Sequence, residues 1–163
     1  MDNINLNLND SQKFIKEYHR HSEPLKRHMF SIGAVEYPGS IALLGIITID
    51  RCSSAWSKRR DHIEIRRLCI KPNAPKNTAS FLISKAKDAC WAMGYKCIIT
   101  YTKPYESGSS LLATGFYIQK AKWGKENIQH PKGLVQWCVS QCSQNNPKNR
   151  EQTKKVLKKF IEV

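Results

Sequence analysis

The sequence has few acidic residues and no long apolar run. Its 163 residues include 13 Asp and Glu against 27 Lys and Arg, which leaves a formal net charge of +14. No apolar segment approaches the roughly 18 residues that a membrane-spanning helix needs, so we expect no membrane partner. The first ten residues, MDNINLNLND, lack the basic start and the apolar block of a signal peptide. We therefore expect a cytoplasmic protein.

Recognised cysteine motifs are also missing. The six cysteines are scattered along the chain and form no CxxC pair. Cys138 and Cys142 alone do not make a structural zinc site, because such a site needs four ligands. Without an export signal, reduced thiols are expected. No metal site is predicted, and whether a metal is needed stays open.

The scarcity of acidic residues leaves a large positive charge to explain. Residues 143–163 carry six basic and two acidic residues, so +4 of the net charge lies there and +10 lies in the rest of the chain. A field of this size attracts polyanions and speeds their encounter with the protein. The charge predicts a nucleic acid as partner. Solubility or an acidic protein partner are the alternatives.

Hydrophobic periodicity predicts one α/β (α+β) domain over residues 1–142. Apolar and polar alternation, with turn residues between the segments, predicts seven strands at 4–8, 29–37, 41–50, 62–70, 96–102, 116–123 and 133–140. A helix capped by Asp10 or Ser11 follows the first strand. A second helix, capped by Thr78 or Asn77, covers 79–94, and a short third covers 106–115.

Residues 143–163 are predicted to form a linker and a basic closing helix. Val156, Leu157, Phe160 and Ile161 recur at helical spacing and are flanked by lysines. We expect this apolar stripe to pack on the domain.

The segment between the strand at 62–70 and the second helix contains no glycine. A strand, a small polar loop and a helix start are the elements from which chains build a phosphate cradle. Lys76 supplies a cation, Thr78 and Ser80 supply hydroxyls, and the helix start supplies free amides. An anion can be held there without glycine. Alternatively, Thr78 and Ser80 only cap their own helix.

The order of elements over residues 4–142 resembles the GNAT acyltransferase fold. The resemblance implies a mixed, mostly antiparallel sheet of the seven strands, flanked by helices. In that superfamily, strands four and five splay apart around the pantetheine of acyl-CoA. The loop after strand four, with the pattern Arg/Gln-x-x-Gly-x-Gly/Ala, holds the pyrophosphate. Pro75, Thr78 and Ser80 occupy the three pattern positions here, so the signature itself is absent. The resemblance implies an acyl-CoA or related acyl donor, bound by Lys76, Asn77, Thr78, Ala79 and Ser80.

A narrower resemblance covers three segments. YHRHSEPLKRHMFSIGAVE, EIRRLCIKPNAPKNTASFL and GYKCIITYTKPYESGSSLLATGF are similar to segments of a phage and mobile-element group related to the DNA-modification protein Mom. Mom places a carbamoylmethyl group on the exocyclic amine of adenine. The resemblance implies a transferase that acts on DNA.

The GNAT resemblance also suggests catalytic residues. GNAT enzymes often use a strand-four carboxylate to accept the amine proton, and Glu64 is the single acid on that strand. An ion pair with Arg66 or Arg67 is the alternative role. Where GNAT enzymes have a Tyr that protonates the thiolate, this chain has Leu111. Tyr101, at the end of strand five, is the nearest replacement.

Two basic segments are predicted to contact the acceptor. The first holds Tyr18, His19, His21 and His28 within eleven residues; His19 and Tyr18 are candidate proton carriers, and His21 and His28 candidate substrate contacts. Surface histidines are the alternative. The second segment combines an aromatic ring with cations. Surfaces that bind nucleic acids use cations to contact phosphates and rings to stack on bases. Its members are Trp56, Lys58, Arg59, Arg60 and Arg66.

The sequence thus favours a GNAT-like transferase that modifies a nucleobase amine in DNA. The alternatives are an acyl-CoA-dependent N-acyltransferase on a small-molecule or protein amine, and a non-catalytic GNAT relic that only binds nucleic acid. The oligomeric state is not indicated by the sequence.

Overall fold

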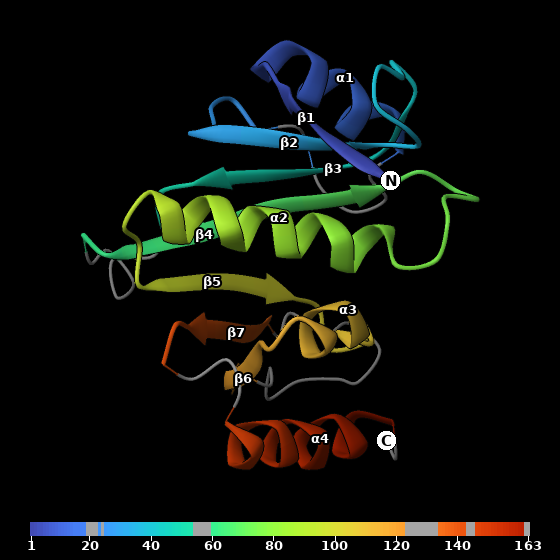
Figure 1. Ribbon diagram of the computed structural model, residues 1–163. Helices are drawn as coiled ribbons and strands as arrows, with labels where there is room; N and C mark the ends of the chain where they lie inside the picture. Colours follow the sequence, from blue (N-terminus) through green and yellow to red (C-terminus); the bar gives the residue numbers. More distant parts are fainter. Residues whose placement is uncertain (19–22, 24, 54–59, 123–133, 143–145, 162–163) are drawn as a thin grey trace.

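Seven strands form one sheet in the order β1-β2-β3-β4-β5-β7-β6. The computed structural model describes residues 1–18, 23, 25–53, 60–122, 134–142 and 146–161. The strands are β1 (Asp2–Leu6), β2 (Phe30–Val35), β3 (Leu43–Asp50), β4 (His62–Ile70), β5 (Cys97–Thr102), β6 (Tyr117–Lys122) and β7 (Leu134–Ser140). The helices are α1 (Leu8–Tyr18), α2 (Thr78–Ala92), α3 (Ser109–Ala113) and α4 (Pro147–Ile161), as Figure 1 shows.

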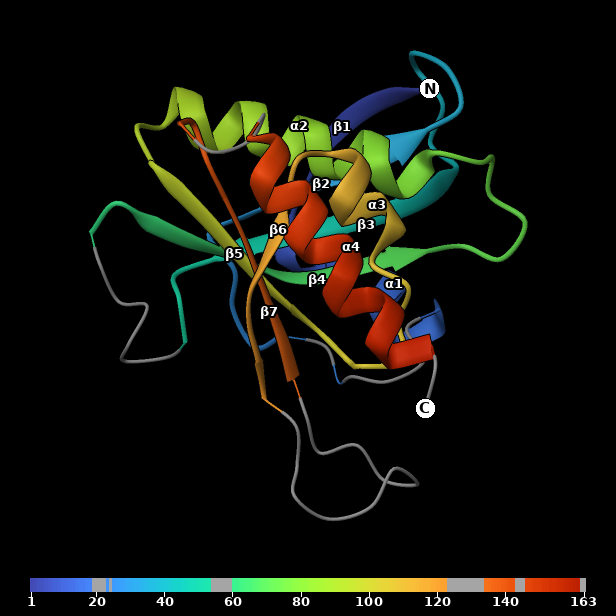
Figure 2. The same ribbon diagram turned by 90° about the horizontal axis from the view of Figure 1, so that it is seen from below.

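The predicted mixed, mostly antiparallel sheet is confirmed. Every neighbouring pair of strands is antiparallel except β4 and β5, which run parallel. Figure 2 shows α2 and α3 on one face of the sheet and α1 on the other. No helix within the described ranges is long and apolar enough to cross a membrane.

The first strand and helix begin earlier than predicted. β1 ends at Leu6, and Leu8 is already the first residue of α1. The helix cap is Asn7, because the amide of Asp10 donates to its Oδ1 at 2.9 Å and its Nδ2 donates to Asp10 Oδ2 at 2.8 Å. The predicted caps Asp10 and Ser11 are therefore wrong. Alternation alone did not distinguish the last strand residue from the first helical one.

A bulge in β4 changes which side chains share a face. Ile65 pairs with Ile49 and Arg67 with Thr48, so Arg66 is an extra residue on β4. Strict alternation places Glu64, Arg66 and Leu68 together, but Leu68 packs with the apolar cluster under α2. Cys69 instead joins the cluster under α1. The prediction of a regular alternation through β4 is wrong from Arg66 onward.

Helix α4 packs against the edge strand β6. The hydroxyl of Thr153 is buried and accepts a hydrogen bond from the Ile118 amide at 3.0 Å. Val156 and Leu157 are partly buried against the main core.

The glycine-free loop before α2 obtains its left-handed turns from asparagine. Asn73 has φ 67° and Asn77 has φ 73°. This conformation costs most L-residues about 1–2 kcal/mol, but asparagine adopts it more readily because its side chain can hydrogen-bond locally. Asn77 is the residue that precedes α2, as one of the two predicted caps, yet its side chain makes no capping hydrogen bond. Its backbone conformation is what shapes the loop.

We predict opposite effects of two substitutions at Asn77. Asn77→Gly should keep the free energy of unfolding close to that of the wild type, because glycine adopts positive φ freely. Asn77→Val should lower it by about 1–2 kcal/mol, because a β-branched side chain clashes in the left-handed region. Urea unfolding measures both. Asn5→Val, an exposed position of β1, is the matched control and should be neutral or stabilising.

Candidate functional site

The parallel strands β4 and β5 separate after three residue pairs. His62, Ile63 and Glu64 pair with Cys97, Ile98 and Ile99, and no pair follows. Further along, the Thr100 hydroxyl donates to the Ile65 carbonyl at 3.1 Å. The bulge at Arg66 begins where the pairing ends. The predicted splayed pair at these strands is confirmed.

A cleft of about 370 Å³ opens at this separation. Residues from β4, α2, β5, α3, β7 and the loop after β5 line it. They are Ile65, Arg66, Arg67, Leu68, Ile83, Thr100, Tyr101, Thr102, Lys103, Glu106, Leu111 and Leu134. The cleft therefore runs between the two parallel strands, and an elongated molecule can enter it.

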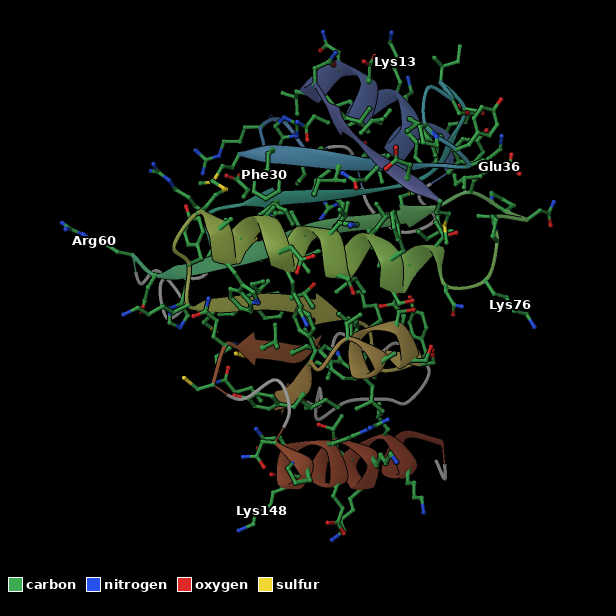
Figure 3. The ribbon with its side chains drawn as sticks, viewed as in Figure 1. Lys13, Phe30, Glu36, Arg60, Lys76 and Lys148 are labelled. Atoms are coloured by element: carbon green, nitrogen blue, oxygen red, sulfur yellow. The ribbon has the colours of Figure 1, made fainter. Side chains whose placement is uncertain are left out.

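The start of α2 leaves backbone amides available to an anion. The Thr78 hydroxyl donates to the Pro75 carbonyl at 2.7 Å, and the Ser80 hydroxyl donates to the Asn77 carbonyl at 3.0 Å. Since these hydroxyls donate to carbonyls, they do not cap the amides of the first turn, and the first turn holds no acidic residue. Ala79 lies between them in this turn, and Lys76 projects from the loop into solvent (Figure 3).

Glu64 is a buried carboxylate with its donors already in place. Its Oε2 accepts hydrogen bonds from the Ser53 amide at 2.8 Å and the Ser53 hydroxyl at 3.1 Å. Its Oε1 lies 3.6 Å from Arg66 Nη1, which is the ion pair considered as the alternative role. Glu64 is thus close to the cleft-lining Arg66, and it is held rigidly.

A cysteine lies near the same carboxylate. Burial, reinforced by the negative charge of Glu64, raises the pKa of Cys52 to about 12. The Cys52 thiol therefore stays protonated near neutral pH, which does not suit a thiolate nucleophile. The chemistry available here is proton transfer and charge stabilisation.

Tyr101 and Leu111 border the cleft from opposite sides. Leu111 is buried in the cluster under α2. Tyr101 packs on the cluster of Cys52, Cys97 and Cys138. Tyr101 therefore reaches the same cleft as Leu111, but its ring lies on the other face of the sheet.

The segment between α1 and β2 is described only in part. Tyr18 packs on Phe14, with ring centroids 4.7 Å apart, and a hydrogen bond with Glu17 raises its pKa. His28 Nδ1 lies 2.6 Å from Ser31 Oγ, and desolvation lowers the pKa of His28 although Asp50 acts against this. His28 is thus neutral near pH 7.

Other predicted contact residues fall elsewhere. His19, His21, Trp56, Lys58 and Arg59 lie outside the described residues. Arg60 is exposed at the start of β4, and Figure 3 shows it projecting away from the body on the side opposite Lys76. Of the two members of the predicted basic set that the structure describes, Arg60 and Arg66, Arg66 lines the cleft. Within the described ranges, no group of three His, Cys, Asp or Glu could hold a metal ion.

Two basic residues of the cleft were not predicted. Arg67 and Lys103 line it together with Arg66. Alternation placed Arg67 away from Arg66, so only knowledge of the bulge would have brought the two arginines to one cleft. Lys103 follows β5 directly and is near the cleft because that strand has separated from β4.

The same architecture occurs in solved acetyltransferases. An IAA acetyltransferase from Bacillus cereus matches with a TM-score of 0.61 at 13% identity, over 85% of this chain and 98% of the other. An aminoglycoside 6'-acetyltransferase type Ii matches with a TM-score of 0.63 at 11% identity, over 86% and 97%. A Bacillus subtilis acetyltransferase in complex with CoA matches with a TM-score of 0.54 at 19% identity, over 80% and 84%.

Comparisons at the level of sequence found no match. No family model and no curated protein sequence matches the chain. At identities below 20%, the structural similarity is a statement about architecture. The chain has the fold of the GNAT acetyltransferases.

Proposed function

We propose that the protein is an acyl-CoA-dependent N-acyltransferase whose acceptor is an exocyclic nucleobase amine in DNA. The observation that carries the transferase part is the cleft between β4 and β5, which α2 borders through Ile83. The net charge of +14 and the sequence segments that resemble Mom-related proteins support DNA as the acceptor.

The donor fits the backbone features of this site. Residues 76–80 would hold its pyrophosphate, with the amides of Ala79 and Ser80 as donors, since the Thr78 amide already donates to the Pro75 carbonyl at 3.2 Å, and Lys76 would add a cation. The unpaired inner edges of β4 and β5 would bind the pantetheine arm by backbone hydrogen bonds. The thioester of the donor supplies an activated acyl carbonyl. The protein's own part is to position that carbonyl near the bulge at Arg66.

The acceptor amine would reach the cleft from the face that carries α1. Tyr18, His28 and Glu64 belong to this face. Glu64 would accept the amine proton through a water molecule, because Ser53 and Arg66 already occupy its oxygens. His19 is the alternative base. Tyr101, on the same side, would orient or protonate the leaving group. In a duplex the target base must flip out, because a stacked amine is out of reach.

Two other functions have specific observations in their favour. The aminoglycoside acetyltransferase among the structural matches favours a small-molecule amine as acceptor. Leu111, at the position where GNAT enzymes carry a proton-donating Tyr, favours a relic that only binds nucleic acid. Donor binding separates the relic from both enzymes. Mass spectrometry of nucleosides from DNA of cells that express the protein separates the two acceptors.

We predict that acetyl-CoA binds at the start of α2. Isothermal titration should give a Kd below about 1 mM. Lys76→Glu should weaken binding several-fold, because it places a negative charge beside the pyrophosphate. Lys148→Glu, exposed on a different side of the molecule in Figure 3, changes the net charge equally and should leave the Kd unchanged. Absence of binding would remove the acyl-CoA proposal.

We predict that substitution of the proton carriers lowers the yield of modified base. Glu64→Gln should lower it by about 100-fold or more, which is typical for loss of a general base. Tyr101→Phe and His19→Ala should each lower it as well. DNA affinity should stay near that of the wild type in all three, which excludes a binding defect. Wild-type yield in all three variants would overturn the catalytic assignment.

We predict that DNA binding weakens steeply with salt. Each phosphate that a Lys or Arg neutralises adds about −0.9 to the slope of log K against log salt concentration. With several such contacts, the Kd should rise by orders of magnitude between 50 and 200 mM salt, on the order of 10³-fold for about six contacts. Fluorescence anisotropy on a labelled duplex measures the slope. A salt-independent Kd would contradict the polyanion argument.

A further inference from the structure

Arg67 brings a cation to the cleft without an acidic partner. Its Nη1 donates to the Arg66 carbonyl at 2.8 Å, and its Nη2 and Nε donate to the Glu23 carbonyl at 3.1 and 3.4 Å. All three acceptors are neutral. In the part of the chain that the structure describes, no carboxylate oxygen lies within 4.0 Å of its guanidinium nitrogens. The positive charge of Arg67 is therefore not neutralised by contact.

A second guanidinium belongs to the same cleft. The bulge places Arg66 next to Arg67 in the lining. Arg66 Nη1 lies 3.6 Å from Glu64 Oε1. Burial lowers the pKa of Arg67, the charge of Arg66 lowers it further, and Glu64 opposes both. Among the described residues, Glu64 forms an ion pair with Arg66 but not with Arg67, and a partly buried cation destabilises the folded state unless a negative group contacts it.

The other residues that line the cleft do not supply a negative group that contacts Arg67. Lys103 adds another cation, and Glu106 is the acidic residue of the lining. The Glu106 carboxylate accepts a hydrogen bond from the Lys103 amide at 2.6 Å, which ties it to the loop after β5. The cleft thus has room for a molecule and an excess of positive charge.

We propose that Arg66 and Arg67 bind an oxyanion group, a carboxylate or a phosphate, on a substrate that enters the cleft. Guanidinium groups match the planar geometry of such groups and bind them with two parallel hydrogen bonds. This proposal rests on the proposed function in one respect, that the cleft takes the substrates of a transferase. The oxyanion has two possible sources, the acyl group of the donor or the nucleotide that carries the acceptor amine.

Two matched pairs of ligands distinguish the sources. Succinyl-CoA and butyryl-CoA share a four-carbon acyl chain and differ in a terminal carboxylate against a methyl group. Deoxyadenosine 5'-monophosphate and deoxyadenosine differ in the phosphate. Isothermal titration gives the Kd of each ligand for the full-length protein. The ratio of the two Kd values within a pair reports the charged group alone, because both members share the same CoA or nucleoside part.

We expect the charged member of at least one pair to bind about tenfold more tightly or better. Arg67→Gln, which keeps a donor for the Glu23 carbonyl but removes the charge, should abolish this preference. Arg67→Lys should keep part of it, because the charge remains and the fork geometry is lost. Arg150→Gln removes the same charge at an exposed position of α4 that does not line the cleft, and it should preserve the preference fully. Thermal unfolding of each variant checks that it is folded.

Each outcome decides the proposal. A preference in the CoA pair assigns the oxyanion to the donor, and a preference in the nucleotide pair assigns it to the acceptor. Equal affinities within both pairs of wild-type protein would overturn the proposal, whether or not the variants fold. A preference that Arg67→Gln leaves intact would overturn it as well. If neither thioester binds, the acyl-CoA part of the proposed function fails, while the nucleotide pair still tests the oxyanion site.

Discussion

The short parallel pairing of β4 with β5 is the constraint on which the remaining features of the site depend. Backbone hydrogen bonds hold the two strands together at Glu64 and its partner Ile99, and the extra residue at Arg66 then bends β4 out of register. A β-bulge increases local twist and re-aims side chains. The same irregularity therefore opens the cleft, turns Leu68 toward α2 and brings two consecutive arginines to the lining.

The strands and helices could be predicted from the sequence because their apolar spacing is regular. The seven strands, the start of α2 at the Asn77–Thr78 junction and the splay at β4 all follow from such spacing or from the order of elements. The arginine pair could not be predicted, since a bulge has no signature in the spacing of HIEIRRLCI. The left-handed backbone conformation of Asn73 and Asn77 could not be predicted either. Their sequence marks a turn, but left-handed conformation is decided by the path that the loop must take.

The distribution of charge adds a physical condition to any model of DNA binding. Lys13, Arg60, Lys76 and Lys148 project on four different sides of the molecule in Figure 3. Cations that are dispersed in this way raise the encounter rate with DNA from every direction, but they do not by themselves orient the cleft toward a base. Contacts near the cleft itself would have to orient the DNA. There, Arg67 donates a hydrogen bond to the carbonyl of Glu23, which lies in the segment after α1.

The packing of α4 on β6 has a consequence for the behaviour of the protein at high concentration. β6 is the last strand of the sheet, and an uncovered last strand offers its amides and carbonyls to any other chain in solution. Here Thr153 occupies the amide of Ile118, and Lys148, Lys154, Lys155 and Lys158 of α4 are exposed to solvent. A chain that ended before Pro147 would expose this edge to intermolecular strand pairing. The C-terminal helix thus acts as a built-in protection against aggregation.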